Sequence, residues 1–156
     1  MKCRVIAAGT RLPGWVDAAF LDYQKRLQKP ISIELHEIHV AARGGSVSTA
    51  RAIEREGQAM LAAIAKDDYV VALEVTGKSL STEDLAQWLQ TRMREGGNIS
   101  FLIGGPDGLM PQCKERAARS WSLSALTFPH GLVRVMLAEQ LYRAASLIAG
   151  HPYHRA

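Results

Sequence analysis

Two stretches of small residues in the C-terminal half have the composition of a ligand-binding loop. The first is Gly104-Gly-Pro-Asp-Gly108, whose glycines allow a backbone to approach a ligand closely. The second is Trp121-Ser-Leu-Ser-Ala-Leu-Thr-Phe-Pro-His130, in which small hydroxyl-bearing residues follow a short apolar-alternating piece. Backbone groups in such a loop are not all used by a strand ladder, so they are free to bind a ligand. Taken alone, the glycine run is equally typical of a plain turn.

The residue patterns of several other kinds of site are missing from the sequence. No Gly-x-Ser-x-Gly nucleophile motif occurs, and neither cysteine has a histidine beside it in the chain. The glycine run lacks the full dinucleotide-binding spacing, and no phosphate-loop lysine motif is present. His130, His151 and His154 have no carboxylate or cysteine at ligand spacing, so we predict no metal site.

Strand and helix patterns alternate along the chain and would place these loops at one edge of a sheet. Apolar runs predict strands at residues 3–8, 31–40, 69–75 and 98–103, and a further short one from Trp121. Helical patterns begin after Pro13, at Thr49, after a capping box at Ser81, at Pro111 and at Leu132. This order predicts an α/β fold with a mostly parallel sheet and helices on both faces. Ligands bind at the carboxyl ends of such strands, here after Val75, after Ile103 and across residues 123–128.

Composition and charge are those of a single globular domain. The 156 residues are 47% hydrophobic and contain no linker or repeat, so we predict one domain over residues 1–156. No apolar run is long enough for a membrane span, and the first one is too short for a signal sequence. Cys3 and Cys113 lie far apart, which favours a cytoplasmic protein without a disulfide framework. The net charge of +4 suits a polyanionic partner, although many basic proteins never contact nucleic acid.

The last helical pattern has apolar residues on more than one face. Its predicted core stripe consists of Val133, Met136, Leu137, Leu141, Ala144 and Ile148. Leu132, Val135 and Leu147 lie outside that stripe. The pattern fits either a helix that packs against a second protein chain or a helix buried deeply within its own chain.

Five motifs follow one another in the sequence: Phe101-Leu-Ile-Gly-Gly-Pro-Asp-Gly108, Trp121 to His130, Leu132-Val-Arg-Val135, Glu139-Gln-Leu-Tyr-Arg143 and His151-Pro-Tyr-His-Arg155. Together they resemble the bacterial ribosomal large subunit methyltransferase H family, whose members are SPOUT-class enzymes. The resemblance covers essentially the whole chain. Phe128 stands where the family commonly has an aliphatic residue.

The resemblance implies a SPOUT-type α/β knot, with a deep trefoil knot in the C-terminal half, and a homodimer with active sites at its interface. It also implies that S-adenosylmethionine binds in the knot. Apolar side chains would enclose the adenine, and backbone groups of the loop would bind its polar edge. The residues expected to form this cofactor site are Leu73, Gly104, Leu123, Ser124, Ala125, Leu126, Thr127 and Phe128.

The reaction that the resemblance implies is methylation of the N3 imide nitrogen of a pseudouridine in large-subunit ribosomal RNA. That nitrogen is a poor nucleophile until its proton leaves, so the site needs a base or support for the imide anion, and no metal. Arg134 and Arg143 suit phosphate or a developing carbonyl charge, and His154 has the pKa range of a base. His130 and Tyr153 complete the candidates. His130 is equally readable as a helix N-terminal residue, and Tyr153 as a docking anchor.

We expect no separate RNA-binding domain, so recognition would depend on basic faces and on the shape of the assembled ribosome. The basic candidates are Arg43, Arg51, Arg55, Lys114, Arg116 and Arg119, the last three on the helix that begins at Pro111. Arg51 and Arg55 also fit an ordinary solvated helix face. The alternatives are a non-catalytic ribosome-binding factor and a mononucleotide-binding α/β enzyme, and neither needs the loop at residues 123–128 or the C-terminal tail.

Overall fold

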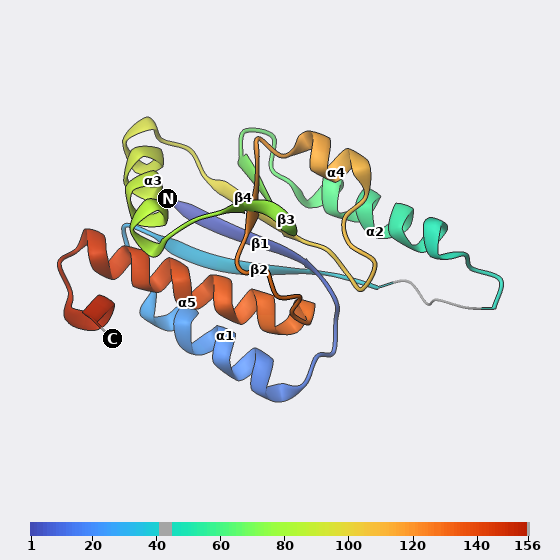
Figure 1. The fold of residues 1–156 in the computed structure, drawn as a ribbon, viewed down its shortest axis with the longest axis horizontal. Helices are drawn as coiled ribbons and strands as arrows, with labels where there is room; N and C mark the ends of the chain where they lie inside the picture. Colours follow the sequence, from blue (N-terminus) through green and yellow to red (C-terminus); the bar gives the residue numbers. More distant parts are fainter. Residues whose placement is uncertain (41–44, 156) are drawn as a thin grey trace.

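The fold is a five-stranded parallel sheet with helices on both faces (Figure 1). The computed structural model describes residues 1–40 and 45–155, except for the side chain of His154. The strands are β1 (Lys2–Ala8), β2 (Ser32–Ile38), β3 (Tyr69–Ser79), β4 (Ile99–Ile103) and β5 (Arg119–Ser122), in the order β2-β1-β4-β3-β5. The helices are α1 (Gly14–Arg26), α2 (Thr49–Ala63), α3 (Thr82–Glu95), α4 (Pro111–Arg116) and α5 (His130–Ile148), followed by the 3-10 turn η1 (Pro152–Arg155). The predicted α/β class with a parallel sheet is confirmed.

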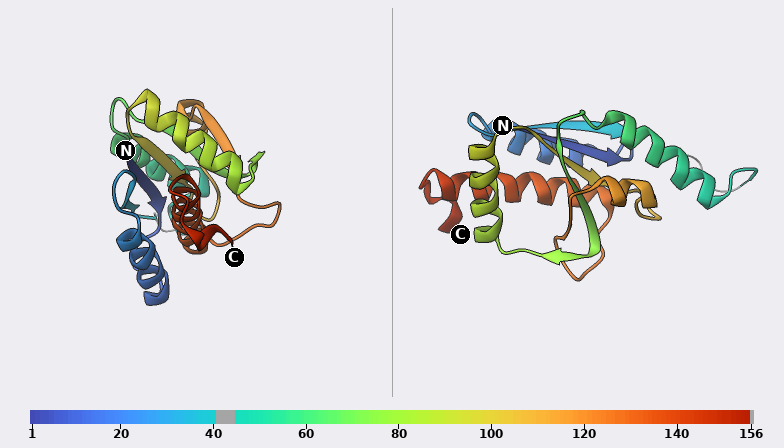
Figure 2. Two further views of the ribbon diagram at one scale, coloured as in Figure 1. Left: turned by 90° about the vertical axis from the view of Figure 1, so that its left-hand side faces the viewer. Right: turned by 90° about the horizontal axis from the view of Figure 1, so that it is seen from above.

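Two cores lie on opposite faces of the sheet because successive side chains of a strand point in opposite directions. Val5 and Phe101 belong to the core shared with α1, α3 and α5, whereas Ile6 and Leu102 belong to the core beneath α2 and α4 (Figure 2). Every residue of β4 is buried. A strand that is covered on both sides is rich in apolar residues, and the sequence predicted a strand here over residues 98–103.

The helix ends follow local signals in the sequence. The Ser81 hydroxyl accepts from the backbone N–H of Asp84, and the Asp84 carboxylate accepts from the N–H of Ser81, so the predicted capping box is present. At the other end of α3, Gly96 adopts a φ of 80° that suits glycine.

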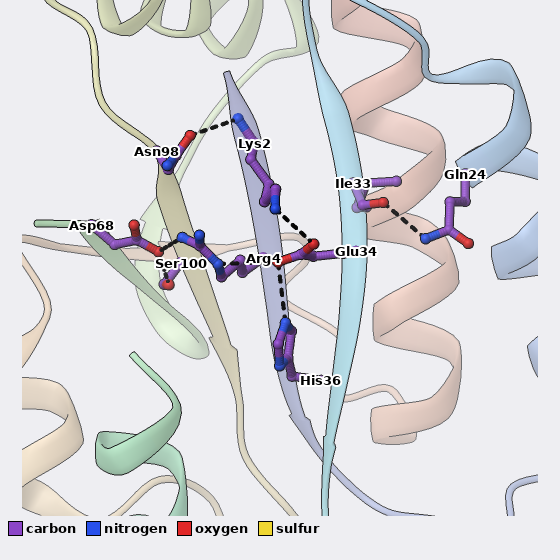
Figure 3. A network of polar contacts seen from close by, with 9 residues as sticks. All are labelled: Lys2, Arg4, Gln24, Ile33, Glu34, His36, Asp68, Asn98 and Ser100. Carbon is purple, nitrogen blue, oxygen red and sulfur yellow. Dashed lines mark hydrogen bonds and ion pairs between the residues drawn. The ribbon is translucent and has the colours of Figure 1, made fainter. Parts of the chain in front are cut away.

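A polar network ties the sheet together at the amino ends of its strands (Figure 3). Arg4 donates to Glu34 of β2 over 3.1 Å and pairs with Asp68, just before β3. The Ser100 hydroxyl of β4 donates to the same Asp68 carboxylate over 2.6 Å. These contacts satisfy a nearly buried carboxylate, so the network has a structural role and lies at the edge opposite the carboxyl ends of the strands.

Strand β3 continues beyond the end that the sequence predicted. We expected it to stop at Val75, but it reaches Ser79 through a register shift between Leu73 and Lys78, both of which pair with Trp121 of β5. Residues 74–77 therefore lie outside the regular ladder. A Cβ atom on Gly77 would lie 2.5 Å from the Trp121 carbonyl carbon, so only glycine allows the backbones to approach this closely.

Two helix predictions were wrong in part. Helix α4 ends at Arg116, and Arg119 belongs to β5, where its guanidinium donates to the Tyr69 hydroxyl over 3.1 Å. On α5 the buried face contains Leu137, Leu141 and Ala144 as expected, and also Ala138, but Val133, Met136 and Ile148 are only half-buried. Arg134 occupies the core position in the first turns of α5, because its guanidinium donates to the buried carbonyls of Ala8 and Gly9.

Candidate functional site

A pocket of about 660 Å³ opens at the carboxyl ends of β3, β4 and β5. Its walls come from residues 73–76, from the turn after β4 and from the loop between β5 and α5. This is the sheet edge where ligands bind in α/β proteins. The pocket brings together all the expected cofactor residues except Ala125, which is exposed in the same loop and does not line it: Leu73, Gly104, Leu123, Ser124, Leu126, Thr127 and Phe128.

The glycine run forms a tight turn that is also part of the pocket wall. The N–H of Gly108 donates to the carbonyl of Gly105 over 3.0 Å. A Cβ atom on Gly104 would lie 2.6 Å from the carbonyl carbon of Gly108 and 2.9 Å from the backbone nitrogen of Leu109. Gly104 is therefore required by the turn itself. The glycine run both forms a tight turn and lines the pocket.

The loop between β5 and α5 is ordered by its own hydroxyl groups. Ser122 donates to the carbonyl of Ser124 over 2.8 Å, and the Ser124 hydroxyl accepts from the N–H of Leu126 over 3.0 Å. Leu126 is 69% exposed at the rim of the pocket. An apolar side chain this exposed is available to a ligand or a partner surface.

One wall carries a charged pair that sequence reasoning missed. The Glu74 carboxylate pairs with Lys114 of α4 at 2.7 Å and accepts from the Ser120 hydroxyl of β5 over 2.7 Å. Burial alone would raise the pKa of Glu74, but the hydrogen bonds from Lys114 and Ser120, together with the lysine charge, lower it. Glu74 follows the predicted pocket residue Leu73, and that position was the one signal that could have revealed it.

The geometry of the pocket agrees with a comparison of the sequence with known families. A family model described as predicted SPOUT methyltransferase matches residues 1–154. The chain belongs to this family. SPOUT methyltransferases generally use S-adenosylmethionine, and the open carboxyl edge of the sheet is where this methyltransferase has space for a ligand.

His130 lines the methyltransferase's pocket as the first residue of α5. Its ring lies against the end of β1, because a Cβ atom on Gly9 would be 2.7 Å from His130 Nε2. Burial, and then the neighbouring Arg134 charge, lower the pKa of His130 from its ordinary value of 6.5, while Glu56 acts in the opposite direction. A neutral imidazole at this wall can accept a proton.

Acid should destabilise the wild-type methyltransferase more than a His130→Gln variant. The pKa of His130 is lowered in the folded protein, so the unfolded chain binds the proton more tightly. The stabilising contribution is complete above the ordinary value of 6.5 and is lost as the pH falls through the lower folded value. Urea unfolding of both proteins at a mildly alkaline and a mildly acidic pH measures this difference. If the free energies of unfolding of wild type and His130→Gln differ by the same amount at both pH values, the lowered pKa is contradicted.

Arg134, which we expected to hold phosphate or a carbonyl charge, is fully buried and does not line the pocket. Its guanidinium donates to Glu37 over 2.8 Å and to the carbonyls of Ala8 and Gly9 over 3.2 and 3.1 Å. A side chain without exposed surface cannot contact RNA. Arg134 instead fastens the start of α5 to the ends of β1 and β2.

The tail candidates gather at the other end of α5. The Arg143 guanidinium pairs with Glu139 at 2.7 Å, and the Tyr153 hydroxyl donates to the same carboxylate over 3.4 Å. Tyr153 also packs edge-on against Tyr142 at 4.6 Å, and its hydroxyl is 3.5 Å from that of Tyr23. The hydrogen bond with Tyr23, followed by burial, raises the pKa of Tyr153 to about 12.

These contacts agree with the alternative role of Tyr153 as a docking anchor. They hold its side chain against α1 and α5, at a distance from the pocket. Arg143 is thirteen residues after His130, which is about 20 Å along an α-helix. Within one chain, therefore, the structure separates His130 from Arg143 and Tyr153. His154 lies in η1, but its side chain is outside the described part of the structure.

The described basic residues expected to contact RNA differ in their surroundings. Arg51 and Arg55 are exposed on α2. Lys114 pairs with Glu74, Arg116 donates to the Asp68 carbonyl over 3.5 Å, and Arg43 lies outside the described residues.

The described part of the chain contains neither a group of three or more metal-ligating side chains nor a helix long and apolar enough to cross a membrane.

Proposed function

We propose that this protein transfers a methyl group from S-adenosylmethionine to the N3 imide nitrogen of a pseudouridine in large-subunit ribosomal RNA. Its substrate would be the assembled ribosome, in the cytoplasm. The observation that carries the proposal is the pocket between β3, β4 and β5, which gathers the segments that the family resemblance marks as the cofactor site. Membership of a methyltransferase family supplies the reaction class.

The size and walls of the pocket fit S-adenosylmethionine. A volume of about 660 Å³ is within the usual range for small-ligand sites. Leu73, Leu126 and Phe128 offer apolar surface for an adenine ring, and the backbone of the loop offers donors and acceptors for its edge. When bound, S-adenosylmethionine supplies a methyl group on a positively charged sulfur.

The chain's own residues would prepare the nucleophile. The imide proton must leave before the nitrogen attacks, and neutral His130 on the pocket wall is one candidate to accept it. His154 remains the second candidate. Arg143 would stabilise the negative charge that develops on the imide carbonyls, and Tyr153 would orient Arg143, whose guanidinium lies 5.0 Å from its ring centre.

The distance between the pocket and the tail supports a homodimer with shared active sites. Two α5 helices packed antiparallel about a two-fold axis would bring the Arg143 end of one chain to the His130 end of the other. Val75 and Leu126 at the pocket are 47% and 69% exposed, which suits burial by a partner. We therefore infer that the tail acts across the dimer.

Mixing two inactive variants tests this arrangement. Gly104→Ala would disable the pocket and Arg143→Ala the tail, so each homodimer should be inactive. If the site is shared, a mixed dimer has one site with both parts intact, and an equal mixture should regain roughly a quarter of wild-type activity. No recovery in a mixture with proven subunit exchange would show that pocket and tail act within one chain.

The decisive activity measurement compares transfer of labelled methyl groups to ribosomes lacking the modification with transfer to deproteinised ribosomal RNA. Label confined to a pseudouridine of intact ribosomes is the expected result. Label on naked RNA would contradict recognition of the assembled shape. Ribosome binding without any binding of S-adenosylmethionine would instead support a non-catalytic ribosome-binding factor.

We also infer, from the family, a deep trefoil knot in the C-terminal half. A knot there would bring the turn after β4 and the loop before α5 close together. Both segments line the pocket, which supports this inference. An experimental structure in which no part of residues 119–148 threads through a preceding loop would contradict this.

A further inference from the structure

The pocket wall formed by β3 and α4 carries two opposite charges that the proposed function has not used. Lys114 Nζ lies 2.7 Å from Glu74 Oε2. Of the described residues that line the pocket, these are the ones that are charged at neutral pH, since the pKa of His130 is lowered. The remaining walls are apolar side chains, small hydroxyl residues and backbone.

Glu74 is held in place on one side and accessible on the other. Its Oε1 accepts from the Ser120 hydroxyl over 2.7 Å, which fixes the carboxylate without neutralising it. Its side chain is 19% exposed and that of Lys114 is 47% exposed. Ion pairs with this much exposure contribute little to stability. Each of the two groups can therefore leave its partner and pair with an opposite charge on a ligand.

The alternation of side chains along β3 explains why the pair borders the pocket. Leu73 still pairs with β4 and turns its side chain into the core under α5. Glu74, one residue later, points to the opposite face of the sheet, where α4 brings Lys114. The charged wall and the α5 wall with His130 therefore belong to opposite faces of the sheet.

A carboxylate beside an ammonium group matches a ligand that carries the same two charges close together. We propose that Glu74 and Lys114 bind the α-amino-acid end of the cofactor, with Lys114 receiving its carboxylate and Glu74 its ammonium group. This rests on the proposed function, because it assumes that a sulfonium nucleoside occupies the pocket. Charge-assisted hydrogen bonds of this kind are among the stronger polar contacts, and they give the site selectivity against nucleosides that lack the amino acid.

Binding of three related nucleosides to the full-length protein tests the assignment by calorimetry. S-adenosylhomocysteine carries both charges, its decarboxylated analogue keeps only the ammonium group, and 5′-methylthioadenosine has neither. Wild type should bind the first roughly ten- to a hundred-fold more tightly than the last. Lys114→Met should lower the affinity for S-adenosylhomocysteine about ten-fold and leave the other two unchanged. Glu74→Gln should weaken both amine-bearing ligands and leave 5′-methylthioadenosine unchanged.

Lys66→Met is the matched control, because Lys66 is exposed in the turn after α2 and does not line the pocket. It should change none of the affinities. An equal loss for all three ligands in the Lys114 or Glu74 variant would overturn the proposal. So would a Lys114→Met variant that binds all three normally but loses affinity for ribosomes, since Lys114 would then contact RNA phosphate.

The wild-type series separates this inference from the function on which it rests. If wild type binds all three nucleosides with equal affinity, the nucleoside pocket stands and the amino-acid subsite is wrong. If it binds none of them, the proposed cofactor and the subsite both fail. Because this series needs no substitution, a variant that does not fold leaves the test intact.

Discussion

A Gly104→Ala variant is expected to lose roughly 100-fold in affinity for S-adenosylmethionine. The new methyl group would lie 2.6 Å from the carbonyl carbon and 2.8 Å from the carbonyl oxygen of Gly108, and neither is the end of a flexible side chain. The turn after β4 must shift to relieve this contact, and the pocket wall shifts with it. Calorimetric titration with S-adenosylmethionine, with circular dichroism to show that the variant is folded, measures the effect.

Gly14→Ala is the matched control for this substitution. Gly14 begins α1, and a Cβ atom there would meet nothing within 4 Å. Its affinity for S-adenosylmethionine should equal that of wild type. If folded Gly104→Ala also binds normally, the turn can absorb a methyl group and the cofactor lies elsewhere.

An Arg134→Met variant is expected to lower the free energy of unfolding by about 3 kcal/mol. Methionine has a similar length but donates nothing, so the carbonyls of Ala8 and Gly9 lose the buried guanidinium that satisfies them. Urea denaturation of the purified protein measures the change. The variant should also bind S-adenosylmethionine less tightly, since α5 begins at the pocket.

Glu37→Gln separates the two parts of this contact. The Glu37 side chain is 34% exposed, so the substitution removes a charge that water already screens and keeps an acceptor for Arg134. We expect a loss of less than about 1 kcal/mol. Equal losses in the two variants would show that the ion pair, and not the bonds to the carbonyls, fastens α5.

The sequence predicted the parts of the fold that depend on local pattern. Continuous apolar runs marked β3 and β4, and the Ser81 capping box marked the start of α3, because these signals lie within a few residues of one another. The pocket segments were found from the family motifs, and the structure places nearly all of them around one cavity.

What the sequence could not predict depends on contacts between distant residues. Arg134 was not recognised as a core residue because a charged side chain is buried only where acceptors bind it. The acceptors of Arg134 lie more than ninety positions earlier in the chain, so no local pattern reveals them. The Glu74–Lys114 pair joins two elements forty residues apart. The register shift of β3 follows from pairing with β5, which no pattern within β3 records.

That shift has a consequence for how the pocket can change over evolution. The pairing of β3 with β4 covers only Tyr69–Leu73, so the residues that follow, up to Lys78, do not set the alignment of the central strands. A residue can be gained or lost there while the sheet keeps its order and its core. The depth of the ligand site and the spacing of its charged wall can therefore diverge between relatives on an unchanged scaffold, which allows one fold to accept differently sized ligands.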